Sequence, residues 1–135
     1  MADLVNEREH RYVYRAVEGV YQEMLELQPG GPDGRSIMDG GRLISDGEAF
    51  DVSGLTPGRP ATLVARSRGG FRVTVTVDGA EVGEWLEQGR GGANWVESSF
   101  TLPAGAIHGA KCRIGVRITE PHTAPWSIFH YWVYQ

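Results

Sequence analysis

Aromatic residues beside glycine-rich loops are the part of this sequence best suited to chemistry. Trp85 and Trp95 flank the run 86–94, which contains three glycines, and Trp126 ends the proline-containing run 120–126. An indole ring offers a flat apolar face on which the C–H face of a sugar ring can stack, while polar side chains nearby bond to the sugar hydroxyls. The spacing therefore indicates a carbohydrate surface formed by these two loops.

Donors and acceptors for sugar hydroxyls lie in and beside the same loops. A different interpretation remains open, in which each tryptophan begins or ends a strand and closes one end of the hydrophobic core. The predicted ligand-binding residues are Trp85, Arg90, Asn94, Trp95, Glu97, His122 and Trp126.

The sequence lacks the motifs that usually mark a catalytic centre. No serine stands in a G-x-S-x-G elbow. The histidines are too widely spaced for a local zinc motif, and they are His10, His108, His122 and His130. We therefore predict no catalytic residue and no enzymatic activity.

Carboxylates near Asp-Gly turns are the hard oxygen ligands that calcium prefers. Their spacing is not that of an EF-hand loop, so the sequence assigns no metal site and no cofactor, and leaves only a structural calcium open. The acids that could hold it are Asp33, Asp39, Asp46 and Glu48.

Composition narrows the class of protein. The 135 residues suffice for one domain, 41% of them are hydrophobic, and the net charge is only -4. We thus expect a folded chain that binds no nucleic acid, since its charge provides no strong positive field. The longest apolar run is too short to span a membrane, so no direct membrane insertion is expected. Localisation stays open, with an extracytoplasmic site expected if the chain was cut from a surface or membrane protein.

Glycine and alternating hydrophobicity predict an antiparallel β-sandwich. Gly occurs 19 times, and short stretches of period-two alternation are separated by Gly and Pro. Asp78-Gly79 predicts a two-residue hairpin turn between strands. Cys112, the single cysteine, excludes an intrachain disulfide and alternates with Ile114 and Val116, which places it in the core. The predicted strands are 42–45, 49–52, 61–66, 71–77, 80–85, 95–102, 111–118 and 126–134.

These elements give one domain, 1–135, with three parts. Residues 1–27 form an N-terminal segment in which a helix and a strand are equally easy to write, 28–41 form a loop, and 42–135 form the sandwich core. The strand 126–134 carries large side chains on both faces, so we expect a central strand, or one whose outer face is a binding surface.

The order of several segments resembles galactose-binding-like β-sandwich modules. The resemblance rests on Asp39-Gly40-Gly41-Arg42, Val77-Asp78-Gly79, Trp95-Val96-Glu97 followed by Phe100-Thr101-Leu102-Pro103, and the closing Phe129-His130-Tyr131-Trp132. More narrowly, it is similar to accessory domains of bacterial glycan-related surface or membrane proteins. This resemblance implies a jelly-roll fold, carbohydrate binding through loops at one end, and in some members a structural calcium.

We therefore expect a non-catalytic carbohydrate-binding or accessory module whose partner is a glycan. The alternative is a structural or assembly domain that associates with a parent protein or a second copy through residues 1–27 or a sheet face.

Overall fold

The computed structural model describes residues 4–26, 36–88, 95–119 and 126–135. They form a short helix α1, eight strands and one 3-10 turn. The elements are α1 (Leu4–Glu9), β1 (Val13–Glu26), β2 (Ser36–Ser53), β3 (Ala61–Arg68), β4 (Phe71–Val77), β5 (Ala80–Glu87), β6 (Val96–Leu102), η1 (Ala104–Ala106), β7 (Lys111–Ile118) and β8 (Trp126–Tyr134). Within the described ranges, no helix is both long and apolar enough to cross a membrane.

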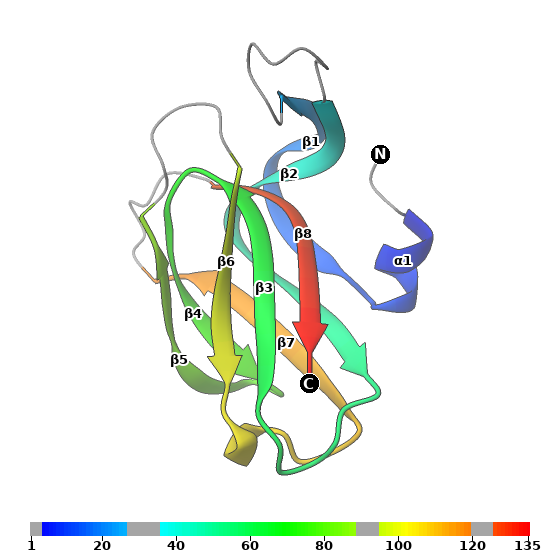
Figure 1. Cartoon of the computed structure of the whole chain (residues 1–135), viewed down its shortest axis with the longest axis vertical. Helices are drawn as coiled ribbons and strands as arrows, with labels where there is room; N and C mark the ends of the chain where they lie inside the picture. Colours follow the sequence, from blue (N-terminus) through cyan, green and yellow to red (C-terminus); the bar gives the residue numbers. More distant parts are fainter. Residues whose placement is uncertain (1–3, 27–35, 89–94, 120–125) are drawn as a thin grey trace.

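Every strand pairing is antiparallel, which confirms the predicted architecture. The strand order is β5-β4-β7-β2-β8-β3-β6, and β1 pairs with β2 beside this path. In Figure 1, β3, β6 and β8 lie in one layer, in front of β4, β5 and β7. The long strand β2 joins the two layers, because its residues 42–44 pair with β8 and its residues 47–53 pair with β7.

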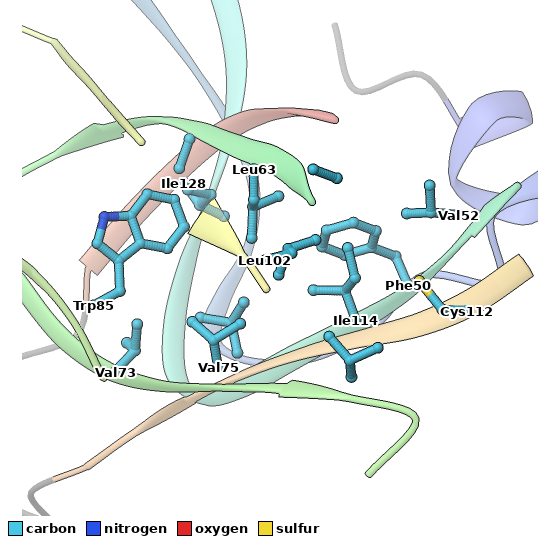
Figure 2. Close-up of a cluster of buried hydrophobic side chains, with 14 of the residues drawn as sticks. Phe50, Val52, Leu63, Val73, Val75, Trp85, Leu102, Cys112, Ile114 and Ile128 are labelled. Atoms are coloured by element: carbon cyan, nitrogen blue, oxygen red, sulfur yellow. The ribbon is translucent and has the colours of Figure 1, made fainter. Parts of the chain in front are cut away.

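The core lies between the two layers. Figure 2 shows side chains from both layers, including Leu63 of β3 and Val75 of β4, pointing toward each other across this space. The alternation in β4 buries Phe71, Val73, Val75 and Val77 as predicted. Cys112 is also buried, confirming its place in the core.

The predicted hairpin is confirmed at Asp78-Gly79. Both residues have a positive φ, 51° and 84°, as a two-residue turn of the kind that fits twisted strands requires. Asp78 adds a bond of its own, because its Oδ1 accepts the backbone N–H of Arg113 at 2.7 Å. The turn is thereby tied to β7.

The N-terminal part differs from the prediction in two ways. Residues 13–26 form strand β1, so the helical alternative is wrong for them, and within residues 4–26 a helix is present only in the short α1. The loop predicted for 28–41 is wrong for residues 36–41, which belong to β2; residues 28–35 lie outside the described residues.

The glycines of β2 explain why its sequence suggested turns. A Cβ at Gly41 would lie 2.8 Å from Cε1 of Phe129, and a Cβ at Gly47 would lie 2.7 Å from the carbonyl oxygen of Val116. Glycine is therefore needed at these positions for close packing inside a continuous strand, rather than for a change of chain direction.

Candidate functional site

Two of the three predicted surface tryptophans are in the core. Trp85 is 4% exposed and Trp126 is 2% exposed, so the prediction that they present rings to a ligand is wrong. Trp85 meets the edge of Phe71 with ring centroids 5.3 Å apart, and Trp126 lies 6.2 Å from the same ring. These indoles close one end of the hydrophobic core, which is the alternative that the sequence left open.

The other predicted ligand-binding residues have mixed positions. Trp95 is half-buried and lies outside the core cluster. Glu97 is exposed, but its carboxylate accepts hydrogen bonds from Arg66 Nε at 3.0 Å and Nη2 at 2.7 Å. The remaining three, Arg90, Asn94 and His122, lie outside the described residues.

The calcium candidates are not brought together. Asp39 Oδ2 accepts a bond from Arg66 Nη1 at 2.9 Å, whereas Glu48 is buried and accepts bonds from two tyrosine hydroxyls. Asp46 is exposed, and Asp33 lies outside the described residues. Among the residues that the structure describes, no three His, Cys, Asp or Glu side chains converge as metal ligands would. Asp39, Asp46 and Glu48 therefore do not form one cluster in the structure.

A bulge in β8 decides which aromatic side chains face outward. Arg66 pairs with His130 and Ser67 pairs with Ile128, so Phe129 is an extra residue opposite this step. Before the bulge the even-numbered residues Trp126 and Ile128 belong to the core, and after it Tyr131 packs against the core instead. The side chains of residues 130 and 132 are consequently on the outer face.

An aromatic and charged cluster covers this outer face, as the large residues on both faces of strand 126–134 suggested. The guanidinium of Arg66 lies 5.2 Å from the ring centre of Trp95 and 5.1 Å from that of Trp132. His130 and Trp132 have ring centroids 4.5 Å apart. Burial would lower the pKa of Arg66, but its hydrogen bonds to Glu97 and Asp39 outweigh burial and raise that pKa. Arg66 is therefore a permanent cation that holds the two indoles in place.

A cleft of about 490 Å³ lies next to this cluster, and we call it the β8 cleft. Its volume is in the range of small-molecule binding sites. One wall comes from the N-terminal residues just before β1, which in Figure 1 lie beside β8 with α1. The lining residues are Glu7, His10 and Tyr12 from that segment, Asp39, Gly40, Arg42 and Phe50 from β2, and Ile128, Phe129, His130, Tyr131, Trp132 and Val133 from β8.

A buried carboxylate lies behind the cleft. The hydroxyl of Tyr12 donates to Glu48 Oε2 and the hydroxyl of Tyr131 donates to Glu48 Oε1, both at 2.5 Å. Burial raises the pKa of Glu48 to about 7, although the two hydroxyl bonds and the nearby Arg42 oppose that rise. The pKa of Tyr12 is also raised, first by burial and then by the Glu48 charge.

Arg42 is a second buried charge at the cleft. Its Nη2 forms an ion pair with Glu7, and its guanidinium lies 4.6 Å from the ring centre of Tyr14 and 5.8 Å from that of Tyr12. The Nε and Nη1 atoms are buried and have no hydrogen-bond partner among the described residues. Arg42 thus links β2 to the N-terminal segment by charge and by ring contacts.

Comparison with known proteins supports the fold class. No family profile matches the sequence, and no curated protein is similar to it. Among solved structures, a family 35 carbohydrate-binding module from Clostridium thermocellum is similar, with a TM-score of 0.50 and 14% identity over 90% of this chain and 96% of that one. The C-terminal family 6 carbohydrate-binding module of a laminarinase from Zobellia galactanivorans has a TM-score of 0.51 and 15% identity, over 87% and 100% of the two chains.

An enzyme is similar too, but only in part. A family 115 4-O-methyl-α-glucuronidase with specificity for decorated arabinogalactans has a TM-score of 0.53 and 14% identity, covering 91% of this chain. This chain spans only 18% of the length of that enzyme. The chain therefore has the fold of galactose-binding-like β-sandwiches of the carbohydrate-binding-module type, and the same fold forms part of that larger enzyme.

Sequence reasoning missed the residues that build the β8 cleft. Trp132 and His130 stand in the strand 126–134, whose large side chains on both faces were the available signal. The bulge at Phe129 and the return of the N-terminal segment onto β2 depend on long-range pairing, which the local pattern does not encode.

Proposed function

We propose that this chain is a non-catalytic carbohydrate-binding module that holds a glycan in the β8 cleft. The cleft combines a half-buried indole, that of Trp132, with the polar side chains of Asp39 and His130. A sugar needs an apolar surface for its ring face and polar groups for its hydroxyls. This combination in one cavity, on a fold shared with isolated carbohydrate-binding modules, carries the proposal.

In this proposal, the indole of Trp132 is the surface on which the sugar ring stacks. The guanidinium of Arg66 and the ring of His130 both contact the indole of Trp132. The position of the indole is therefore restrained before a ligand binds. A preorganised ring loses little conformational freedom on binding, which favours affinity.

The proposal includes the absence of catalysis, which the carboxylates of the cleft support. Hydrolysis of a glycosidic bond by the usual route needs two carboxyl groups that face the scissile bond. Here Glu7 is paired with Arg42, and Asp39 is bonded to Arg66. Both acids are therefore engaged in ion pairs and suit hydrogen-bond acceptance better than proton transfer.

The test is a glycan array followed by calorimetry with the best oligosaccharide. Trp132→Ala should weaken binding by about tenfold, the loss expected when one aromatic contact is removed. Tyr134→Ala is the matched control, because Tyr134 is on the same strand and 58% exposed but does not line the cleft. Equal affinities for the two variants, with both melting like the wild type, would contradict binding in the β8 cleft.

The assembly function remains the alternative hypothesis. Val13 and Tyr14 are exposed large side chains of the N-terminal segment and give it some support. Against it, residues 7–12 bond to their own sandwich through Glu7, His10 and Tyr12. Under this alternative, Val13→Ser would change the elution volume in size-exclusion chromatography, whereas the binding module proposal expects no change.

A further inference from the structure

Several polar contacts hold the N-terminal wall of the β8 cleft, beside the packing of Tyr12 against the core. Glu7 pairs with Arg42, and the His10 Nδ1–H donates to the carbonyl oxygen of Asp51 at 2.6 Å. In return, the Asp51 N–H donates to the carbonyl oxygen of His10 at 2.6 Å. Since this segment forms few ladder bonds before β1 begins at Val13, its position depends on these side chains.

Glu48 bridges the two sides of the cleft. One carboxylate oxygen takes the hydroxyl of Tyr12 from the N-terminal wall, and the other takes the hydroxyl of Tyr131 from β8. Both tyrosines line the cleft, whereas Glu48, which is 4% exposed, does not. A change at Glu48 can therefore reach a ligand only through the tyrosines.

Arg42 provides the second connection between the wall and the sandwich. It is buried in β2 and pairs with Glu7 of α1, and its guanidinium lies over the ring of Tyr14. An ion pair or charged hydrogen bond that is removed from water is stronger than a neutral one on the surface. Both buried side chains, Glu48 and Arg42, thus act on the same short segment, residues 7–14.

We propose that Glu48 is a positioning residue for glycan binding: by bridging Tyr12 and Tyr131, and together with Arg42, it sets the distance between the N-terminal wall and β8. This inference rests on the proposed function for its ligand, but it concerns residues that the ligand does not touch. Without the bridge, the wall opens and the cleft loses the shape that a sugar ring requires.

The first measurement is amide hydrogen exchange without ligand. Tyr12→Phe removes the bond on the wall side of Glu48, and Tyr131→Phe removes the equivalent bond on the β8 side. The reporters are the amides of Asp51 and Tyr12, which bond to the carbonyls of His10 and Glu7. Tyr12→Phe should speed exchange of these amides by about tenfold, as expected for the loss of a bond to a charged group. Tyr131→Phe should change them less than about twofold, because β8 is held in its ladder with β3.

The second measurement is the Kd for the oligosaccharide selected on the array. Glu48→Gln should weaken binding by about tenfold, because one amide cannot accept bonds from both hydroxyls. Glu81→Gln, the same substitution on an exposed residue of β5, should leave Kd unchanged. The amide of Leu63 in the core should exchange equally in the two tyrosine variants, which separates local opening from global unfolding.

Three outcomes would overturn the inference. Unchanged exchange of the Asp51 amide in Tyr12→Phe would show that the bond to Glu48 does not hold the wall. Unchanged Kd in Glu48→Gln would show that the wall does not shape the ligand site, even where exchange has accelerated. Faster exchange at Leu63 in the affected variants would assign the effect to overall stability. Failure of the wild type to bind any glycan on the array would instead refute the proposed function. This result does not depend on any of the variants.

Discussion

Replacing Glu48 with glutamine should remove a large part of the pH dependence of folding stability. Glu48 is buried, and its pKa in the folded chain is about 7, compared with an ordinary value of 4.5. The protonated form is therefore favoured by folding. Its stabilising contribution is fully present below the unfolded pKa and is lost as the pH rises through about 7.

The size of the effect follows from the shift of the pKa. A difference of about 2.5 units, at about 1.4 kcal/mol per unit, corresponds to about 3 kcal/mol between acidic and weakly alkaline solution. Tyr12, Tyr131, Arg42 and Glu7 are the charged or titratable groups around this carboxyl, and none of them is removed by the substitution. The introduced glutamine side chain would resemble the protonated carboxyl in shape and charge.

The assay is urea unfolding followed by tryptophan fluorescence, for wild type and Glu48→Gln at about pH 5 and about pH 8. Asp51 has the opposite pH dependence, because its bonds to Arg11 and Arg113 lower its pKa and its contribution is lost in acid. This dependence is common to both proteins and cancels in their difference. We expect wild type to lose about 2.5 kcal/mol relative to the variant between these two pH values, because the unfolded carboxyl is already largely ionised at pH 5. A constant difference would refute the raised pKa of the buried Glu48 carboxyl.

Four further substitutions, one of them a surface control, test the core and the turn by chemical or thermal unfolding. Trp126→Ala should cost about 3–5 kcal/mol of stability, and a loss of glycan affinity without destabilisation would return this indole to the surface. Leu63→Ala should cost about 2–5 kcal/mol, while Leu86→Ala, at an exposed position, should change stability by less than about 0.5 kcal/mol; equal costs would contradict the core between the two layers. Gly79→Ala should cost about 1 kcal/mol because φ is 84° there, and an unchanged melting temperature would contradict the turn geometry.

Local patterns predicted most of the sandwich because its strands alternate strictly. The alternation from Phe71 to Val77 predicts a strand with one buried face, and Asp78-Gly79 predicts the turn that follows. Neither prediction requires knowledge of the partner strands. The same holds for β7, where Cys112, Ile114 and Val116 face the core. In β4 and β7, the hydrophobic residues that alternate in the sequence are the ones buried in the structure.

The incorrect predictions concern residues whose role depends on a contact with a residue far away in the sequence. Gly41 looks like part of a turn, but it makes room for the ring of Phe129, which is far away in the sequence. Trp85 and Trp126 stand at loop ends, but their indoles pack on Phe71 between the layers. Similarly, Glu48 looked like a surface acid beside a turn, and its bonds to Tyr12 and Tyr131 could not be foreseen from spacing.

The most direct test of the β8 cleft is a titration of the labelled chain with the selected oligosaccharide, followed through the indole N–H signals in a two-dimensional nitrogen–proton spectrum. The chain has four tryptophans, so each signal can be assigned with one Trp→Phe variant. We expect the signal of Trp132 to shift with saturation, while those of the buried Trp85 and Trp126 stay in place. Saturable binding that leaves Trp132 unmoved would contradict the assignment of the β8 cleft as the glycan site.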